Sequence, residues 1–321
     1  MTKEYVISVD LGGTKILSAI LDGELNIVKR YKIETDATKG ADYLVNSVAE
    51  CVRTILSETN IPQEEVKAIC MGVPGTVNPE GIIGNAPNLQ IKSFNIREAL
   101  QKFFEIPVFI ENDVNLAALG IKKFEFKDDV KNMLVVFLGT GIGSGLIFNG
   151  RMYRGSSFFA GEIGHMLVNE NGSFSGDANN LSTFENLASR TAVVKAIEKD
   201  IAAGKKSKLS KILNKGEKIK SKSLAKAVAK EDEVTIKHID RACKITGTVL
   251  GSITTLLNVD TIVLGGGVIE AMEEYTLPKI KDAFYKAVLK EPGKDCKIVP
   301  TKLGDDAAIY GGVSLADEFL A

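Results

Sequence analysis

The chain has 321 residues, of which 45% are hydrophobic and 25% charged, the composition of an ordinary globular protein with room for two domains. Its formal net charge of -1 excludes a strong overall field toward nucleic acid or a membrane surface, and no apolar stretch is long enough to span a bilayer. The chain enters a strand pattern at once, without a signal-peptide pattern, and its four cysteines are scattered, so we expect a cytoplasmic protein with reduced thiols.

The first third of the chain alternates patterns typical of strands and helices. Apolar runs broken by a glycine turn and an Asp-Gly turn predict an antiparallel meander at the start. The predicted elements, in chain order, are the meander over 5–33, a helix over 41–58, a strand over 66–73, a short helix over 94–104, a strand over 108–110 and a helix over 114–120 opened by Asn112 and Asp113. This alternation indicates an α/β layer fold.

The rest of the chain begins with a second hairpin closed by a glycine turn, so the two halves indicate a duplicated core rather than a short repeat array. The predicted elements are strands over 134–138 and 146–148 joined by a turn over 139–145, a helix over 183–202, a helix over 240–257, a strand over 261–264 and a closing helix over 307–319. Residues 204–230 are lysine-rich with helical spacing, which favours a solvated helical face over an anion-binding patch.

Two glycine-rich turns carry the strongest functional signal. Asp10-Leu11-Gly12-Gly13-Thr14-Lys15 and Gly139-Thr140-Gly141-Ile142-Gly143 each follow a buried-strand pattern, and in such turns bare backbone N–H groups can face an anion. Neither turn matches a P-loop, and the dinucleotide pattern fails because the required glycine falls on Ser144 or Leu146. The alternative is two tight hairpins whose glycines only supply positive φ. The pair, with a carboxylate leading one turn, favours a site for a nucleotide polyphosphate.

The order of five motifs resembles that of ROK-family sugar kinases over nearly the whole chain. The motifs are Asp10–Lys15, Glu111-Asn112-Asp113, Gly139–Gly143, Gly161-Glu162-Ile163-Gly164-His165 and Leu264-Gly265-Gly266-Gly267. The resemblance implies an α/β protein with the actin-like, hexokinase-type fold, in which two ribonuclease-H-like domains flank a cleft. It places a small domain at residues 1–118, completed by the C-terminal helix over 305–321, and a large domain at residues 119–304.

The resemblance implies transfer of the γ-phosphoryl group of ATP to a sugar hydroxyl, with Asp113 as the catalytic proton acceptor. The position suits this chemistry because a helix N-terminus favours the ionised carboxylate, which can accept a proton from an attacking hydroxyl. The alternative is that Asp113 only caps the helix and has no catalytic role.

The same resemblance assigns the remaining site residues. The cofactor-binding set is Asp10, Gly12, Gly13, Thr14, Lys15, Gly139, Thr140, Gly141, Gly143, Gly265, Gly266 and Gly267, with Asp10 holding Mg²⁺ directly or through water. An exposed hairpin lysine remains the alternative for Lys15. The sugar-binding set is Gly75, Asn112, Asp113, Glu162, His165 and Glu185.

One segment departs from the family pattern. Many members carry a zinc site built from the histidine equivalent to His165 and a cysteine cluster, whereas residues 171–183 hold no cysteine. Ser175, Asp177 and Thr183 fall near the ligand positions and are poor zinc ligands. We therefore expect no structural zinc, and a loop held by Asn and Asp side-chain turns.

The resemblance leaves the sugar open. Glucose, phosphorylated at its 6-hydroxyl, is the substrate we expect, because Ala86-Pro87-Asn88-Leu89 resembles the glucokinase-like branch. This activity would belong to glycolysis. N-acetylmannosamine, N-acetylglucosamine, mannose, fructose and β-glucosides remain alternatives. A sugar-sensing regulator of the same family is the remote alternative; it would carry a DNA-binding domain before the first strand, for which we expect no room here. A chaperone or filament protein of the same fold is disfavoured because it would not need the sugar-binding set. A homodimer or tetramer without nucleic-acid or membrane partners is expected.

Overall fold

The computed structural model describes residues 4–127, 129–174 and 181–320. The chain divides into two compact units, one of residues 1–131, 145–160 and 305–321, the other of residues 132–144 and 161–304. Below they are called unit 1 and unit 2. The domain boundary expected at residue 118 lies inside a helix that continues to Phe124, and it stays a prediction about domains. In the part of the chain that the structure describes, no helix has the length and apolarity that crossing a membrane requires.

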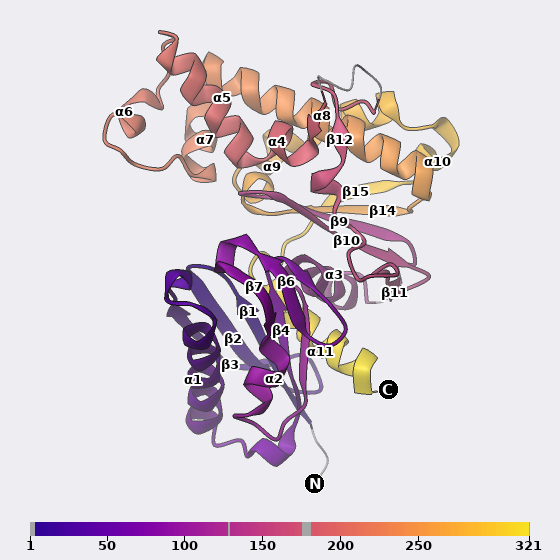
Figure 1. Cartoon of the computed structure of the whole chain (residues 1–321). Helices are drawn as coiled ribbons and strands as arrows, with labels where there is room; N and C mark the ends of the chain where they lie inside the picture. The colour runs from indigo at the N-terminus through magenta and orange to yellow at the C-terminus, as the bar shows by residue number, and fades with distance from the viewer. Residues whose placement is uncertain (1–3, 128, 175–180, 321) are drawn as a thin grey trace. The chain divides into compact units, whose positions relative to one another are not determined.

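Unit 1 is built on a five-stranded sheet of order β3-β2-β1-β4-β8, with a smaller sheet of β5, β6 and β7 (Figure 1). The predicted meander is confirmed, since β1 pairs antiparallel with β2, and β2 with β3. The elements are β1 (Tyr5–Leu11), β2 (Lys15–Leu21), β3 (Ile27–Glu34), α1 (Ala41–Thr59), β4 (Val66–Val73), β5 (Thr76–Val77), β6 (Ile82–Ala86), β7 (Ile91–Asn95), α2 (Ile96–Gln101), β8 (Val108–Asn112), α3 (Asp113–Phe124), β11 (Arg151–Met152) and α11 (Asp306–Leu320).

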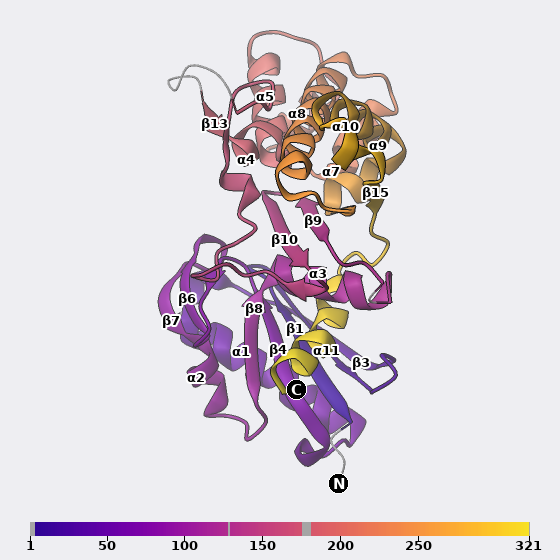
Figure 2. The same ribbon diagram turned by 90° about the vertical axis from the view of Figure 1, so that its right-hand side faces the viewer.

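Side-chain alternation along β1 explains how this sheet is covered. Ile7 and Val9 belong to the apolar core that includes α1, whereas Ser8 donates a hydrogen bond to the carbonyl of Ala308 in α11. Helix α1 therefore covers one face, and α3 and α11 cover the other, as Figure 2 shows for α11 running over β1 and β4. The last helix of the chain therefore packs on a face of the first sheet.

In unit 2, the helices follow the first strands of the second sheet along the chain. The two longest of them, α8 and α9, pack against one another. The elements are β9 (Met133–Leu138), β10 (Ile142–Phe148), β12 (Leu167–Val168), β13 (Ser182–Thr183), α4 (Phe184–Ala188), α5 (Arg190–Ala202), α6 (Ser210–Leu213), α7 (Ser221–Val228), α8 (Glu233–Leu257), β14 (Thr261–Gly265), α9 (Gly267–Ala287), α10 (Lys290–Lys294) and β15 (Lys297–Pro300). Strand β10 crosses the division between the units, at residues 144 and 145.

The second sheet has the order β11-β10-β9-β14-β15 and so repeats the strand order of the first. Its β9, β14 and β15 are parallel, as β1, β4 and β8 are in the first sheet. The duplicated core is therefore confirmed, and the fold is the mixed α/β architecture of actin-like proteins.

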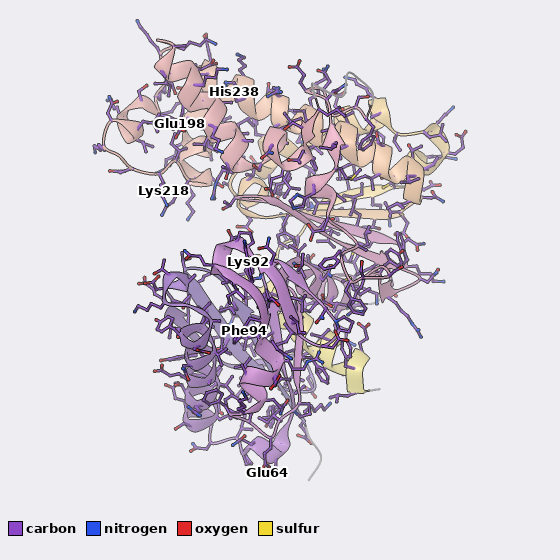
Figure 3. All side chains as sticks on the ribbon, in the orientation of Figure 1. Glu64, Lys92, Phe94, Glu198, Lys218 and His238 are labelled. Atoms are coloured by element: carbon purple, nitrogen blue, oxygen red, sulfur yellow. The ribbon has the colours of Figure 1, made fainter. Side chains whose placement is uncertain are left out.

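Two predicted elements differ in detail, and a third segment agrees with its prediction. The turn after β9 ends at Gly141, because β10 already begins at Ile142. The helix expected over 183–202 is broken at Ser189, whose extended backbone and hydroxyl start α5. Residues 204–230 form the two short helices α6 and α7 with turns between them. Their lysines are exposed, as the labelled Lys218 in Figure 3 illustrates, in agreement with the solvated face that the spacing favoured.

Candidate active site

The carboxyl ends of three parallel strands in unit 1 bring the first group of candidate residues to one sheet edge. Asp10 on β1 is level with Gly72 on β4, and Gly72 is level with Glu111 on β8. Two strand spacings separate Asp10 from Glu111, or about 10 Å between backbones. Open α/β sheets bind their ligands at this edge.

The start of α3 fixes Asn112 and Asp113 at that edge. Asn112 caps the helix, because its Oδ1 accepts hydrogen bonds from the N–H of Val114 at 2.9 Å and of Asn115 at 3.1 Å. Its Nδ2 donates to the carbonyl oxygen of Gly75 at 3.0 Å. Asp113 is the first helical residue, and its Oδ1 also accepts from the N–H of Val114 at 2.9 Å. The helix N-terminus therefore favours the ionised form of Asp113.

Gly75 is required by the backbone at this point. Its φ is +104°, and a Cβ atom there would lie 2.3 Å from the carbonyl oxygen of Asn85 and 2.9 Å from the Cα of Ala86. A side chain at this position would displace the backbone that Asn112 holds.

A partly buried ion-pair network, centred on Glu111 and Arg154, supports the Asn112–Asp113 pair from behind. Glu111 accepts hydrogen bonds from the N–H of Asn112 and from Nδ2 of Asn115, and its other oxygen accepts from Nε of Arg154 at 2.6 Å. Arg154 also donates to both carboxylate oxygens of Glu318, on α11. Burial lowers the pKa of Arg154, but Glu318 and Glu111 outweigh it and hold that pKa above its ordinary value.

Asp10 lies beside the first glycine turn. Burial raises its pKa to about 6, the charge of Lys15 lowers it, and the charge of Asp305 raises it. The ammonium group of Lys15 pairs with Asp305 at the start of the C-terminal segment, so this lysine has a structural partner within unit 1. A nearby cation would favour the ionised form of Asp10, so this single carboxylate suits Mg²⁺ that also takes phosphate oxygens.

Close backbone approach explains the glycines of this turn better than positive φ does. A Cβ on Gly13 would lie 2.4 Å from the carbonyl oxygen of Asn88, and a Cβ on Gly12 would lie 3.1 Å from that of Lys15. Neither has a φ in the left-handed region. Thr14, between them and β2, is exposed.

In unit 2, Glu185 holds the turn between β9 and β10. Its Oε2 accepts a hydrogen bond from the N–H of Ile142 at 2.8 Å, and a Cβ on Gly141 would lie 2.2 Å from the same oxygen. A Cβ on Gly139 would meet nothing within 4 Å, so the turn is open at that residue. Thr140 is exposed, and Gly143 lies within β10.

The Gly161–His165 motif packs onto β10 through its two glycines. A Cβ on Gly161, whose φ is +94°, would lie 2.7 Å from the carbonyl oxygen of Ser144, and a Cβ on Gly164 would lie 2.3 Å from that of Ile142. This packing brings Glu162 and His165 beside the strand that Glu185 also contacts. Both side chains are exposed, and His165 Nε2 lies 3.7 Å from Glu162 Oε2.

The third glycine group joins a strand to a helix. Gly265 ends β14, Gly266 has a φ of +85°, and Gly267 begins the 21-residue α9, whose N-terminus lacks a side-chain cap. A Cβ on Gly266 would lie 2.7 Å from the carbonyl oxygen of Leu138, at the end of β9. Because β9 and β14 are parallel neighbours, the N–H groups of α9 start beside the turn that begins at Gly139.

Residues 171–183, where the family's zinc site is not expected, follow β12, and the end of this segment pairs with β12 as β13. Leu167 pairs with Thr183, and Val168 with Ser182. Asn169 Oδ1 accepts from the N–H of Asn171 and of Ser173, a side-chain turn that begins just before the segment expected to hold such turns. Ser175 and Asp177 lie outside the described residues. Over the described ranges, no group of three or more His, Cys, Asp or Glu side chains is placed to hold a metal ion.

The structure thus sorts the candidate residues into two local groups. Unit 1 holds Asp10, Gly12, Gly13, Thr14, Lys15, Gly75, Asn112 and Asp113 at one sheet edge. Unit 2 holds Gly139, Thr140, Gly141, Gly143, Glu162, His165, Glu185, Gly265, Gly266 and Gly267 around the ends of β9 and β14. Each group stands at the carboxyl ends of parallel strands.

Comparison with known proteins identifies relatives over nearly the full length. The family whose model matches is the ROK family, over residues 6–318. A glucokinase of Halalkalibacterium halodurans is 29% identical over 97% of this chain and 94% of its own. The xylose repressor of Bacillus subtilis is 26% identical over 98% of this chain and 78% of its own. A ROK family glucokinase from Streptomyces griseus, solved with glucose and AMPPNP, is 25% identical, with a TM-score of 0.79 and coverage of 98% and 99%.

Proposed function

The chain belongs to the ROK family, and from that premise we propose that it is an ATP-dependent sugar kinase that phosphorylates the 6-hydroxyl of glucose. The observation that carries the proposal is the placement of Asn112 and Asp113 at the start of α3, with Asn112 bonded to Gly75 and Asp10 on the same sheet edge. The full-length similarity to glucokinases, one of them bound to glucose and an ATP analogue, supports the same activity.

In this proposal Asp113 accepts the proton of the attacking sugar hydroxyl. Phosphoryl transfer needs positioning, charge neutralisation and a proton acceptor, with little covalent chemistry by the protein. A carboxylate at a helix N-terminus stays ionised at neutral pH, so it can accept the proton as the oxygen–phosphorus bond forms. Asn112 and the backbone of Gly75 position the sugar beside it.

The glycine turns bind the nucleotide in this proposal. The N–H groups around Gly12, Gly13 and Thr14 are proposed to bind phosphate oxygens, those around Gly139 to Gly143 are proposed to do the same, and Gly265 to Gly267 are proposed to contact the adenosine. Lys15 adds positive charge near the phosphates, tempered by its pair with Asp305. Asp10 holds Mg²⁺, directly or through water. When bound, Mg²⁺ neutralises phosphate charge.

Glu162, His165 and Glu185 provide the sugar contacts of unit 2. Glu162 and His165 are exposed on a short 3₁₀ helix, Ile163–His165, and so can hydrogen-bond a polyol. Unmatched buried hydroxyls cost about 1–3 kcal/mol each, so such a set discriminates between sugars. Glucose is the proposed substrate; N-acetylhexosamines, mannose, fructose and β-glucosides are the competing ones.

A sugar panel tests the proposal. Purified protein with ATP and Mg²⁺ is offered each of these sugars and ADP release is followed, with the phosphorylated position identified by NMR. We expect turnover with the highest kcat/KM on glucose, at the 6-position. A higher kcat/KM on another sugar changes the substrate, whereas sugar binding without ADP release on any sugar favours a regulator, as the repressor relatives suggest.

The cell compartment and the assembly follow the same reasoning. All four cysteines are free and buried, which supports a reducing compartment such as the cytoplasm. A homodimer or tetramer is the assembly we propose, and light scattering of the purified protein measures it.

A further inference from the structure

Arg190, the first residue of α5, fastens that helix to the turn between β9 and β10. Its Nη2 donates a hydrogen bond to the hydroxyl of Thr140 at 2.6 Å, and its backbone N–H donates to the carbonyl oxygen of Gly139 at 3.0 Å. The neighbouring Thr191 hydroxyl donates to the carbonyl of Thr140 at 2.7 Å. The guanidinium group therefore lies at the turn that the proposed function assigns to phosphate.

The position of this charge runs against local helix electrostatics. The N-terminus of a helix carries partial positive charge, so a cation in the first turn is unfavourable. No ion pair joins Arg190 to a carboxylate in residues 4–127, 129–174 and 181–320 that offsets this. Residues that break a local rule without local compensation are expected at functional sites.

The surroundings of the guanidinium suit an anionic ligand. Arg190 lies near the end of β9 and the start of α9, where it borders a small, mainly apolar cavity together with Leu138 and Ile269. The start of α9, without a side-chain cap, and the open position at Gly139 adjoin it. Thr140 occupies a single donor of the five that a guanidinium carries, so a fork of donors remains for two phosphate oxygens.

We propose that Arg190 binds the β- and γ-phosphates of the nucleoside triphosphate and positions them for transfer. The inference rests on the proposed function for the identity of the donor and adds a residue that the glycine motifs do not contain. Backbone N–H groups supply dipoles to the phosphates, and Arg190 supplies a full charge in bidentate geometry.

Binding measurements without sugar test the inference. Dissociation constants of ATP, ADP, AMP and adenosine, with Mg²⁺, are measured by calorimetry for the native chain, R190Q and R190K. We expect R190Q to weaken ATP about tenfold to a hundredfold, ADP less, and adenosine less than twofold, because charged hydrogen bonds to the terminal phosphates are lost. R190K keeps the charge without the fork, so its loss is intermediate, and it carries the test if R190Q does not fold.

The matched control is K195Q, which removes an exposed positive charge from the same helix away from the turn. It should leave all four affinities unchanged. Equal weakening of adenosine and ATP in R190Q, or unchanged ATP affinity, overturns the inference. Inorganic tripolyphosphate serves as a second probe: if R190Q weakens it but leaves ATP unaffected, the nucleotide assignment is wrong.

The two proposals fail separately. If no sugar is phosphorylated but R190Q weakens ATP binding as expected, the kinase proposal is overturned and Arg190 remains a phosphate ligand. Turnover on a sugar with unchanged ATP affinity in R190Q overturns the role of Arg190 alone.

Discussion

Asn112 and Asp113 are adjacent at the start of α3, and their hydrogen bonds show which of the two caps the helix. The plain-cap alternative for Asp113 requires its side chain to be the N-cap, but the cap is Asn112, which accepts from two backbone N–H groups. Asp113 is the first helical residue and contacts one N–H that Asn112 already serves. The N-cap is therefore Asn112, and the proposed catalytic role of Asp113 does not depend on its capping the helix.

The residue-scale prediction is that Asp113→Asn removes catalysis and leaves binding. Loss of the proton acceptor should lower kcat by about 10²–10⁴-fold, while sugar affinity, measured by calorimetry, changes little. Asp42→Asn, the same change in the first turn of α1, serves as the control and should keep full kcat. Near-native kcat in the Asp113 variant would contradict the assignment.

The glycines show what the sequence can and cannot predict about the site. Turns at Gly12, Gly13 and Gly139 were predictable from apolar runs that end in glycine. Their reason was not, because Gly13 is required by the backbone of Asn88, and Gly141 by the carboxylate of Glu185, both far along the chain. Arg154 and Arg190 lie in ordinary sequence contexts, and Glu111 lies in a motif that assigned it no role. All three gain their roles from tertiary contacts.

Among the elements, the 25-residue α8 depends on a buried cap. Asp232 accepts hydrogen bonds from the N–H and hydroxyl of Thr235, each at 2.8 Å, from the hydroxyl of Ser207 at 3.2 Å and from the N–H of Lys208. Burial raises the pKa of Asp232, but these hydrogen bonds outweigh burial and leave it below the ordinary value. The cap therefore stabilises α8 fully while Asp232 is ionised.

This cap predicts a pH-dependent difference between the native chain and Asp232→Asn. A lowered folded-state pKa adds stability above about pH 4, and that stability is lost as pH falls through the folded pKa. Asparagine keeps a cap without titrating, so the variant should be about 1 kcal/mol less stable at pH 7, and the difference should be smaller at pH 3. Urea unfolding at both pH values measures the difference; a gap that does not change with pH would argue against this role.

The loop between β12 and β13 gives a second element-scale prediction. Its base is held by strand pairing and by Asn169, and its sequence lacks the cysteines of zinc-binding relatives. We expect purified protein to contain less than about 0.1 zinc per chain by mass spectrometry, and EDTA to leave the melting temperature unchanged in the absence of ligands. One tightly held zinc per chain would refute the expectation.

Element boundaries were the least predictable part of the fold. The helix after residue 240 was expected, but its start at Glu233 depends on the cap at Asp232. The break between α4 and α5 depends on Ser189, which is buried and accepts from the N–H of Ala192. The order of the two large sheets was predictable as a duplication from the hairpins. The separate small sheet of β5, β6 and β7 was not, because its strands are too short to carry a periodic signal.

At the scale of the whole molecule, the C-terminal segment returns to complete unit 1. Two ion pairs, Lys15–Asp305 and Arg30–Asp306, fasten its start to the β2–β3 hairpin, and α11 then packs against α3. The two helices approach so closely that a Cβ on Gly311 would lie 1.8 Å from the carbonyl oxygen of Leu116, and a Cβ on Gly120 would lie 2.0 Å from that of Ala307. Because Glu318 on α11 pairs with Arg154, this packing also supports the network behind Asp113.

The closing helix therefore predicts that Gly311→Ala destabilises the protein, against the ordinary preference of helices. Alanine inside a helix is normally favoured by about 1 kcal/mol over glycine, so a loss must come from packing. We expect a loss of about 3 kcal/mol in the free energy of unfolding, because the new methyl group meets backbone rather than a movable side chain. Gly23→Ala, where the nearest atom to a Cβ is 4.0 Å away, should change stability little. Urea denaturation of both variants decides the matter, and a Gly311 variant as stable as the native chain would show that α3 and α11 are not so closely packed.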